Sequence, residues 1–333
     1  MKNKSANLLS LYQPYPPSYI QPFLSAKERK RLKGVNRHCG MEYTSFPFFS
    51  SLGHYSRFVH SVGVSYLLSR FTKEPKVILS GLFHDISTPV FAHVIDFLLG
   101  DHRKQEATEG KTKERIEGSV LIQENLRKMG LTTMDVFDYH RYSLADNASP
   151  MLSADRLEYT LSNSVNFGFA SETEIGQILS DLVVSLNEKG EQEICFRTPG
   201  PAERFTYFSL KAGRIYSCDE DRYAREYLSH VLSFARKVHV LARNDLYSTE
   251  KEVISKRNAD ERTRKRYESF TSLCKVIRGK KGRPYSYLIP VKKRFIDPFV
   301  VGRGRVSSFS PARKKERDDF RSLSFDYYLV KDE

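Results

Sequence analysis

The stretch that decides the fold is residues 57–86, which read RFVHSVGVSYLLSRFTKEPKVILSGLFHDI. Apolar residues recur at helical spacing over Ser56–Phe71, so we expect an amphipathic helix there, with His60 in its first turns. A second helix is expected over Lys76–Ile86, because Pro89 follows and disfavours a helical residue before it. Two successive helices of this kind predict a mainly α-helical domain.

The rest of the chain extends this prediction in both directions. Residues 1–25 contain four prolines and are expected to form an irregular arm. Asp101–Lys113 is expected to be a solvated loop, since 8 of its 13 residues are charged or histidine. Further helices are expected over Phe91–Leu99, Glu117–Met129, Asp135–Tyr142, Ala154–Ser162 and Thr173–Asn187.

The pattern changes after about residue 190. Glu193–Arg197 is expected to be a strand, and Arg204–Leu210 a second strand paired with it around the turn sequence TPGP at 198–201. We expect long helices over Asp221–Leu246 and Glu250–Arg278, and short strands at Tyr285–Ile289 and Phe299–Val301. The predicted fold is therefore mainly α, with a helical core over residues 26–190 and a mixed α+β C-terminal region over 191–333.

The charge is concentrated at one end of the chain. The net charge is +14, and residues 251–333 hold 23 Lys plus Arg against 11 Asp plus Glu, a local net charge of +12. A basic region favours an anionic partner, here a nucleotide or a nucleic acid. The alternative is a solubilising surface without a partner.

Cysteine usage and hydropathy bear on the compartment. The four cysteines are far apart and form no C-x-x-C pair, which argues against a zinc ribbon or a disulfide framework. No run approaches the roughly 20 apolar residues that a membrane span needs. We therefore expect a cytoplasmic protein that does not enter a membrane. The sequence leaves open whether the chain forms a homo-oligomer.

Four residues carry the predicted chemistry: His60, His84, Asp85 and Asp155. Two imidazoles and two carboxylates suit one divalent metal ion such as Mn, Fe, Co, Ni, Zn or Mg, whose identity the sequence does not give. Asp85 follows an apolar helix, where an unpaired charge would be costly, and a metal would remove that cost. Taken singly, His60 has the alternative of a core histidine and Asp155 that of a helix N-cap.

Three motifs that contain these residues resemble those of HD-domain phosphohydrolases. Residues 57–64 (RFVHSVGV) resemble the R-x-x-H-S-x-G-V signature of that superfamily. Residues 81–86 (GLFHDI) resemble its L-x-H-D-I element, and residues 153–159 (SADRLEY) its closing D-A-D-R-L-D-Y element. The similarity is greatest to the dGTPase-like branch, which includes the SAM-and-HD-domain dNTP triphosphohydrolases. Weaker similarity continues in LARNDLY at 241–247 and KKRFIDP at 292–298.

The resemblance implies a helical fold, a divalent metal bound by the H…HD…D residues, and hydrolysis of a phosphate ester or anhydride. A divalent metal lowers the pKa of water and neutralises a phosphoryl oxygen. Asp85 would take part in catalysis through the metal. Arg57 lies on the same helix face as His60 and is predicted to bind phosphate; its alternative role is an ion pair with a nearby acid.

Two histidines of the branch are replaced in this chain. Thr88 occupies the position of the first histidine after the HD pair. Arg115 occupies the position of the histidine in an H-E-x-G-S element. His93 is kept, and Asp96 three residues later is placed to orient it, so this pair is predicted to be the general acid for the leaving group. The alternative for His93 is a packed histidine at a helix start.

Three further residues are predicted to bind substrate. Tyr159 and Asn163 stand where the family contacts a nucleotide, and His38 stands where relatives carry a Q-L-G element that helps to recognise deoxyribose. Ordinary packing or capping is the alternative for all three. The predicted function is a metal-dependent hydrolase of a nucleotide or another phosphorylated small molecule, with a (deoxy)nucleoside triphosphate as the finer expectation. The alternative is a regulatory module that binds a nucleotide or nucleic acid with little turnover.

Overall fold

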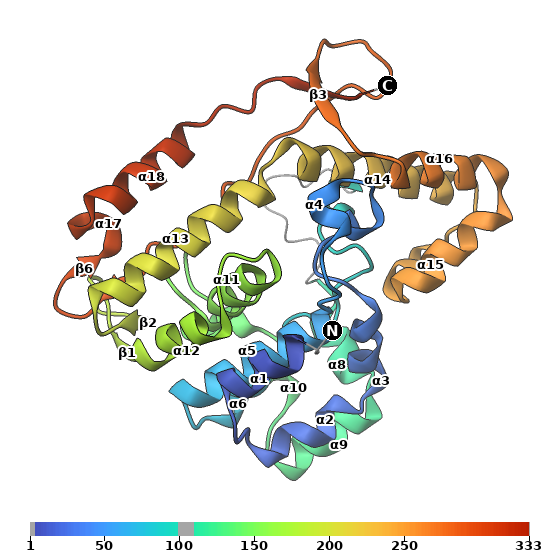
Figure 1. Ribbon diagram of the computed structural model, residues 1–333. Coiled ribbons are helices and arrows are strands. Elements are labelled where there is room, and N and C mark those ends of the chain that lie inside the picture. The colour runs from blue at the N-terminus through green and yellow to red at the C-terminus, as the bar shows by residue number, and fades with distance from the viewer. Residues whose placement is uncertain (1–3, 99–109, 333) are drawn as a thin grey trace.

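The computed structural model describes residues 4–98 and 110–332, and these ranges are mainly α-helical with a few short strands (Figure 1). The fold-class prediction is therefore confirmed. The α-helices are α1 (Lys4–Tyr12), α2 (Gln21–Leu24), α3 (Lys27–Lys30), α4 (Pro47–Ser50), α5 (Arg57–Phe71), α6 (Pro75–Phe83), α7 (Val94–Leu98), α8 (Thr112–Glu117), α9 (Val120–Lys128), α10 (Thr133–Val136), α11 (Ala154–Asn166), α12 (Glu172–Asp181), α13 (Pro199–Tyr216), α14 (Asp219–Lys237), α15 (Glu250–Lys256), α16 (Glu261–Thr271), α17 (Val306–Phe309) and α18 (Pro311–Ser322).

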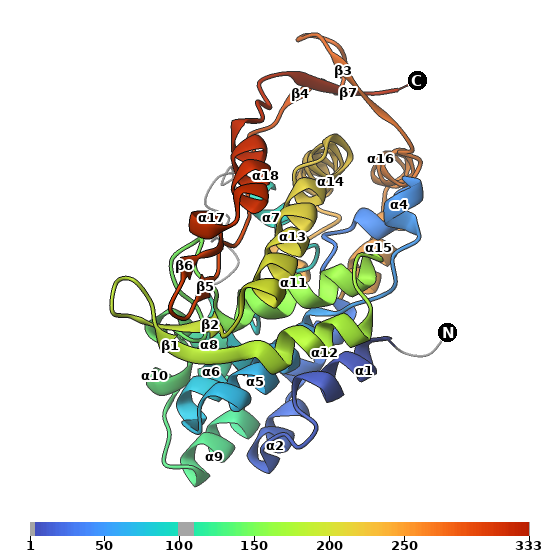
Figure 2. The same ribbon diagram turned by 60° about the vertical axis from the view of Figure 1, so that its left-hand side comes forward.

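The strands form two small sheets. One has the order β1 (Leu182–Leu186), β2 (Gln192–Phe196), β5 (Phe299–Val300) and β6 (Gly304–Arg305). The other has the order β3 (Val276–Gly279), β7 (Tyr328–Lys331) and β4 (Tyr287–Leu288), and it lies at the end of the molecule opposite α2 and α9 (Figure 2). Six 3-10 helices complete the described ranges: η1 (Ser18–Ile20), η2 (Arg31–Gly34), η3 (Met41–Tyr43), η4 (Tyr139–Arg141), η5 (Arg243–Tyr247) and η6 (Arg257–Ala259).

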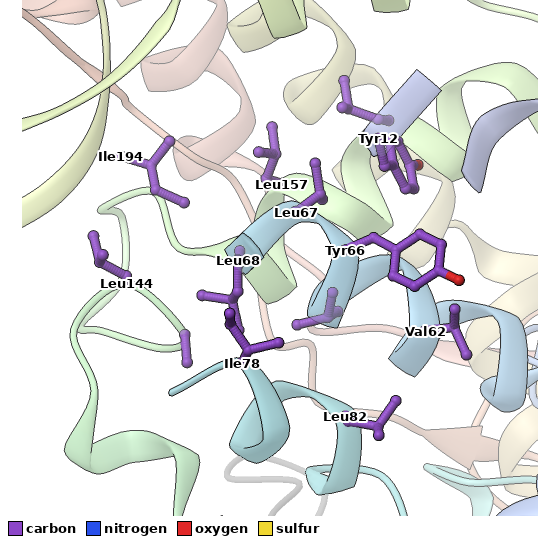
Figure 3. Close-up of a cluster of buried hydrophobic side chains, with 14 of the residues drawn as sticks. Tyr12, Val62, Tyr66, Leu67, Leu68, Ile78, Leu82, Leu144, Leu157 and Ile194 are labelled. Atoms are coloured by element: carbon purple, nitrogen blue, oxygen red, sulfur yellow. The ribbon is translucent and has the colours of Figure 1, made fainter. Parts of the chain in front are cut away.

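The central helix pair is closely packed. Gly81 lets α6 approach α5, since a Cβ atom at this position would lie 2.4 Å from Cδ1 of Leu68. Leu67, Leu68 and Ile78 are buried in this contact, among the side chains of Figure 3. Close packing of these two helices brings their histidines to one place.

The N-terminal arm is not irregular as predicted. It contains α1, which packs against α5 and buries Leu8 and Tyr12 there. These two residues are four positions apart and therefore lie on one helix face. Figure 3 shows the Tyr12 ring close to α5.

The predicted hairpin around TPGP is wrong. The strand at Glu193–Arg197 exists as β2, but it pairs antiparallel with β1, where Val183 faces Cys195. Pro199 begins helix α13 instead, because proline is favoured in the first turn of a helix, and Phe205 and Phe208 are buried on its inner face. The helix predicted over Thr173–Asn187 correspondingly ends at Asp181, where the β-branched sequence of β1 takes over.

Other boundaries differ by shorter amounts. The helix predicted over Asp221–Leu246 ends at Lys237, and that predicted over Glu250–Arg278 is interrupted after Lys256 and ends at Thr271. The predicted helix at Phe91–Leu99 begins only at Val94, and residue 99 lies outside the described residues. Most of the predicted loop at 101–113 also lies outside them, and its last residues belong to α8.

Two clusters of buried apolar side chains support the fold. The first includes Leu67, Leu157 and Phe205, and the second includes Val35, Phe91 and Leu228. Both clusters contain residues from each side of position 190. The domain boundary that we predicted there stays a prediction. Among the described helices, none combines the length and apolarity needed to cross a bilayer.

Candidate metal centre and cavity

Three helices bring the predicted metal ligands together. His60 lies in the first turn of α5, whose N-cap Ser56 accepts a hydrogen bond from the backbone N–H of Val59 at 3.3 Å. His84 and Asp85 directly follow α6, and Asp155 lies in the first turn of α11. The N-cap of α11 is Ser153, so Asp155 does not serve as the cap. Its carboxylate remains available to the cluster.

The side chains of His60, His84 and Asp155 meet at one place, and Asp85 lies beside the two histidines. Nε2 of His60 lies 3.2 Å from Nε2 of His84 and 3.0 Å from Oδ1 of Asp155. Oδ2 of Asp85 lies 3.7 Å from Nε2 of His60 and 3.5 Å from Nε2 of His84. The ligating atoms of His60, His84 and Asp155 all lie within 4.8 Å of one another. Ligation itself stays a prediction.

The hydrogen bonds of the two histidines show that a cation fits this cluster. Nδ1 of His84 donates to the carbonyl oxygen of Gly81 at 2.7 Å, and Nδ1 of His60 donates to Glu158. Because a carbonyl and a carboxylate only accept, these contacts favour the tautomer that leaves the Nε2 lone pair of each ring inside the cluster. The two Nε2 atoms and the carboxylate of Asp155 face one another, with Asp85 beside the histidines, and this set of nitrogen and oxygen donors suits a divalent cation.

Neighbouring groups keep Asp85 ionised. Burial acts to raise its pKa, but the guanidinium of Arg57 and the two imidazoles hold the pKa of Asp85 well below its ordinary value. Nη1 of Arg57 donates to both oxygens of Asp85 at 3.1 Å, so the ion pair considered for Arg57 is present. The hydroxyl of Thr88 donates to Oδ1 of Asp85 at 2.7 Å. Thr88 therefore holds a metal-ligand candidate in place.

A cavity of about 430 Å³ opens in front of the cluster. Its lining includes the cluster, both predicted substrate contacts on α11, and side chains from α14 and the segment 290–294. Seven of the described lining residues are cationic, namely Arg37, Arg57, Arg156, Arg222, Arg225, Lys292 and Arg294, against four carboxylates at Asp85, Asp146, Asp155 and Asp221. A multiply charged anion is the ligand that this excess favours.

The predicted substrate contacts are only partly in this cavity. Arg57, Tyr159 and Asn163 line it, and Nδ2 of Asn163 donates to the hydroxyl of Tyr216 at 2.5 Å. His38 is not among the described lining residues: Asn166 contacts its Nε2 at 2.8 Å, and burial, with a smaller effect of Arg37, lowers the pKa of His38 to about 3. Its two neighbours in the sequence, Arg37 and Cys39, line the cavity instead.

His93 and Asp96 form the predicted pair. Nδ1 of His93 lies 2.8 Å from Oδ2 of Asp96, and the His93 side chain lines the cavity. Burial, with the positive charges of Arg294 and Arg57, holds the pKa of His93 well below its ordinary value. Arg115 lies elsewhere: its guanidinium stacks on the ring of Tyr247 at 4.9 Å.

Sequence reasoning missed several residues of the site. His140 and Asp146 form a second histidine–carboxylate pair at 2.7 Å on the cavity wall, and Arg156 pairs with Asp146 at 3.1 Å. No motif contains His140. Lys292 and Arg294, in contrast, belong to the KKRFIDP element, whose conspicuous charge was a usable signal.

Known proteins are similar to this chain at low identity. No protein-family model matches it. The uncharacterized protein YdhJ of Bacillus subtilis is 27% identical over 251 residues, which are 74% of each chain. The metal-dependent phosphohydrolase cns2 of Cordyceps militaris is 29% identical over 163 residues, which are 48% of this chain and 44% of cns2.

A solved structure of a hypothetical protein from Aquifex aeolicus has the same overall fold. Its TM-score is 0.63 at 16% identity, and the match covers 95% of this chain and 93% of that one. The fold is thus shared along nearly the whole chain, and about half of the chain is similar in sequence to a protein named as a metal-dependent phosphohydrolase.

Proposed function

We propose that this protein is a metal-dependent phosphohydrolase whose substrate is a nucleotide. The observation that carries the proposal is the meeting of two Nε2 lone pairs and two carboxylates on the wall of a cationic cavity. The similarity to cns2 supports the reaction type, because that protein is named for it.

The residues divide into those that hold a metal and those that bind phosphate. His60, His84, Asp85 and Asp155 would hold one divalent ion, which lets water attack phosphorus at neutral pH and offsets charge on a phosphoryl oxygen. Arg57 and the cations of the cavity would bind the phosphate oxygens by charge-assisted hydrogen bonds. His93, oriented by Asp96, would give a proton to the leaving group.

A (deoxy)nucleoside triphosphate is the finer proposal. Seven cationic residues against four carboxylates suit several phosphates better than one. Tyr159 and Tyr216, which also line the cavity, offer aromatic surfaces to a base or a sugar. Nucleic-acid binding by the basic region after residue 251 and homo-oligomerisation both stay predictions.

A regulatory module that binds a nucleotide with little turnover is the second candidate. The surroundings of His93 favour it, since burial first and the nearby arginines second lower the pKa of His93 and so disfavour the protonated imidazole that a general acid needs. A bound polyphosphate would oppose this effect, because its negative charge neutralises the same arginines. Turnover therefore distinguishes the two functions.

The test is a substrate screen with defined metal. The protein is stripped with a chelator, loaded separately with Mn²⁺, Co²⁺, Fe²⁺, Ni²⁺, Zn²⁺ or Mg²⁺, and incubated with nucleoside mono-, di- and triphosphates in ribo and deoxy forms. Released phosphate, pyrophosphate and triphosphate are measured, with Asp155→Asn as the control. Triphosphate release supports the finer proposal, and phosphate release from monophosphates indicates a phosphomonoesterase. Binding without release of any product supports the regulatory module.

A further inference from the structure

A buried glutamate lies directly behind the metal cluster. Glu158 is on α11, one turn after Asp155, and has no exposed surface. A carboxylate so placed is costly unless hydrogen bonds and opposite charges offset its lost hydration. The partners of Glu158 therefore indicate its role.

Each oxygen of Glu158 has its own set of partners. Oε2 accepts from Nδ1 of His60 and lies 3.3 Å from Nη1 of Arg37 and 3.4 Å from the hydroxyl of Ser162. Oε1 accepts from the hydroxyl of Tyr55 at 2.5 Å, and the hydroxyl of Tyr12 lies 3.4 Å away. One carboxylate thus joins a metal-ligand candidate to an arginine of the cavity wall.

The helix that carries His60 leaves room for this carboxylate. A Cβ atom at Gly63 would lie 2.9 Å from Cγ of Glu158 and 3.1 Å from Cε2 of Tyr12. Gly63 has ordinary helical geometry, so its function here is space and not an unusual backbone angle. The glycine of the RFVHSVGV motif is therefore explained by the group that packs against it.

The N-terminal arm completes the environment of Glu158. Tyr12 is fully buried, and its backbone carbonyl accepts a hydrogen bond from Nη1 of Arg70 at 3.0 Å, which anchors the end of α1. The phenol of Tyr12 closes one side of the carboxylate, as that of Tyr55 closes another. Rotation of the carboxylate would break several of these contacts at once.

We propose that Glu158 is a positioning residue that holds His60 with its Nε2 lone pair toward the metal and holds Arg37 against the cavity. This inference deepens the proposed function and rests on it for the metal. A carboxylate that accepts from Nδ1–H fixes the orientation and tautomer of a metal-binding imidazole and makes Nε2 a stronger donor to the metal. Because the same carboxylate holds Arg37, metal affinity and substrate affinity share one support.

The primary test is Glu158→Gln, which keeps the shape and removes the charge. Metal-free protein is titrated with Co²⁺, and binding is followed by visible absorption in the absence of substrate. Removing the group that accepts a hydrogen bond from the other ring nitrogen of a metal-bound histidine typically lowers metal affinity about 10–100-fold. We expect the Co²⁺ affinity of Glu158→Gln to fall within that range. With saturating metal, we expect the kcat of Glu158→Gln to return closer to the wild-type value than its KM does. The reason is that Arg37 has still lost its charged partner and binds substrate less well.

Glu193→Gln is the matched control. Glu193 is also a fully buried glutamate, bound by both terminal nitrogens of Arg305 at 2.7 Å, but it lies in β2 and is not among the described residues that line the cavity. We expect this variant to lose thermal stability and to keep the Co²⁺ affinity of the wild type. A general effect of removing a buried charge would instead lower Co²⁺ affinity in both variants and would overturn the proposal.

A second variant covers the case in which Glu158→Gln does not fold. Tyr12→Phe with Tyr55→Phe keeps the carboxylate and the ring volumes but removes both phenolic donors. Both phenols help to hold the carboxylate that accepts from His60, so we expect a measurable, at least ~3-fold, loss of Co²⁺ affinity in the double variant. Wild-type affinity there, or in folded Glu158→Gln, contradicts the role of Glu158.

The outcomes separate this inference from the proposed function. A wild-type protein that binds Co²⁺ but hydrolyses no phosphate compound contradicts the proposed function, while the variant-to-wild-type affinity ratio still decides the role of Glu158. A wild-type protein that binds none of the divalent metals contradicts both.

Discussion

The two walls of the cavity are built in different ways. The ligand wall consists of His60, His84, Asp85 and Asp155, with Glu158 behind them, and comes from the packed helices α5, α6 and α11. The cationic wall consists of Arg37, Arg222, Arg225, Lys292 and Arg294 and comes from segments that are far apart in the sequence. In the first wall every side chain except Asp155 is buried, and the side chains contact one another, which suits a fixed metal. The second presents charge to a cavity, which suits an exchangeable anion.

This difference implies that the two walls fail in different ways. Changes in the ligand wall should remove metal and activity together. Changes in the cationic wall should leave metal in place and weaken substrate binding. Arg57 belongs to both, since it pairs with Asp85 and also lines the cavity.

The largest effect is expected from Asp155→Ala. Removing this carboxylate leaves two histidines and one paired carboxylate, so we expect loss of bound metal and hydrolysis no faster than the uncatalysed reaction. The fold should persist, because Ser153 and not Asp155 caps α11. Metal analysis, phosphate release and circular dichroism check these points together. Normal metal content with full activity would remove Asp155 from the ligand wall.

His93→Ala tests the proton donor between the two walls. Proton transfer by a placed side chain contributes about 10²–10⁴-fold, so we expect a nucleotide to be hydrolysed at least ~100-fold more slowly. An activated aryl phosphate should be slowed much less, because its leaving group needs no proton, and metal content should not change. Equal slowing of both substrates would assign His93 to positioning, and His140 with Asp146 would become the next donor to test.

Arg294→Ala tests the cationic wall. A hydrogen bond between charged groups contributes about 1.5–3 kcal/mol, which corresponds to a rise in KM of about 10–100-fold at unchanged metal content. The matched control is Arg264→Ala, an arginine on the exposed side of α16 that pairs with Glu268. Loss of metal in Arg294→Ala would show that the walls are not independent.

The smallest effect is expected outside both walls, at Glu42. Burial and the neighbouring Glu250 raise the pKa of Glu42 to about 8 from 4.5. Below pH 4.5 both the folded and the unfolded states hold this proton; above it the unfolded state ionises first, so stability is lost as the pH rises toward 8. Glu42→Gln should flatten this decline and raise the melting temperature at pH 8 by at least ~2 °C, with metal content and KM unchanged. An equally steep decline in the variant would show that Glu42 is not its cause.

The ligand wall could be predicted from the sequence and most of the cationic wall could not. His60, His84, Asp85 and Asp155 lie in short motifs on strongly periodic helices, so local pattern and chemistry agree there. Arg37 and Arg222 meet only through tertiary packing, which no local pattern specifies, whereas Lys292 and Arg294 lie in the charged KKRFIDP element. The sequence predicted the adjacent His38 instead of Arg37, because a resemblance over residues 38–40 indicates a segment and not the direction of its side chains.

The fold, too, could be predicted only where the local sequence pattern agrees with the tertiary packing. The helices around residues 57–83 were predicted to within a few positions, because burial and periodicity act in the same direction. The sequence TPGP was interpreted as a turn, although Pro199 begins α13 and β2 finds its partner in β1 upstream. Proline is compatible with both a turn and a first helical turn, and the apolar face of Phe205 and Phe208 decides between them only when the rest of the core is present.

The central claim is that one divalent ion, held by the ligand wall, is needed for hydrolysis of a nucleotide. The most direct measurement is a titration of chelator-stripped protein with the best metal of the screen, in which bound metal per chain and rate of phosphate-product release are followed in the same samples. We predict that the rate rises in proportion to bound metal and saturates at about one ion per chain, and that Asp155→Asn shows neither. Full hydrolysis by the metal-free protein, or a fully loaded protein that hydrolyses no nucleotide, would contradict the account.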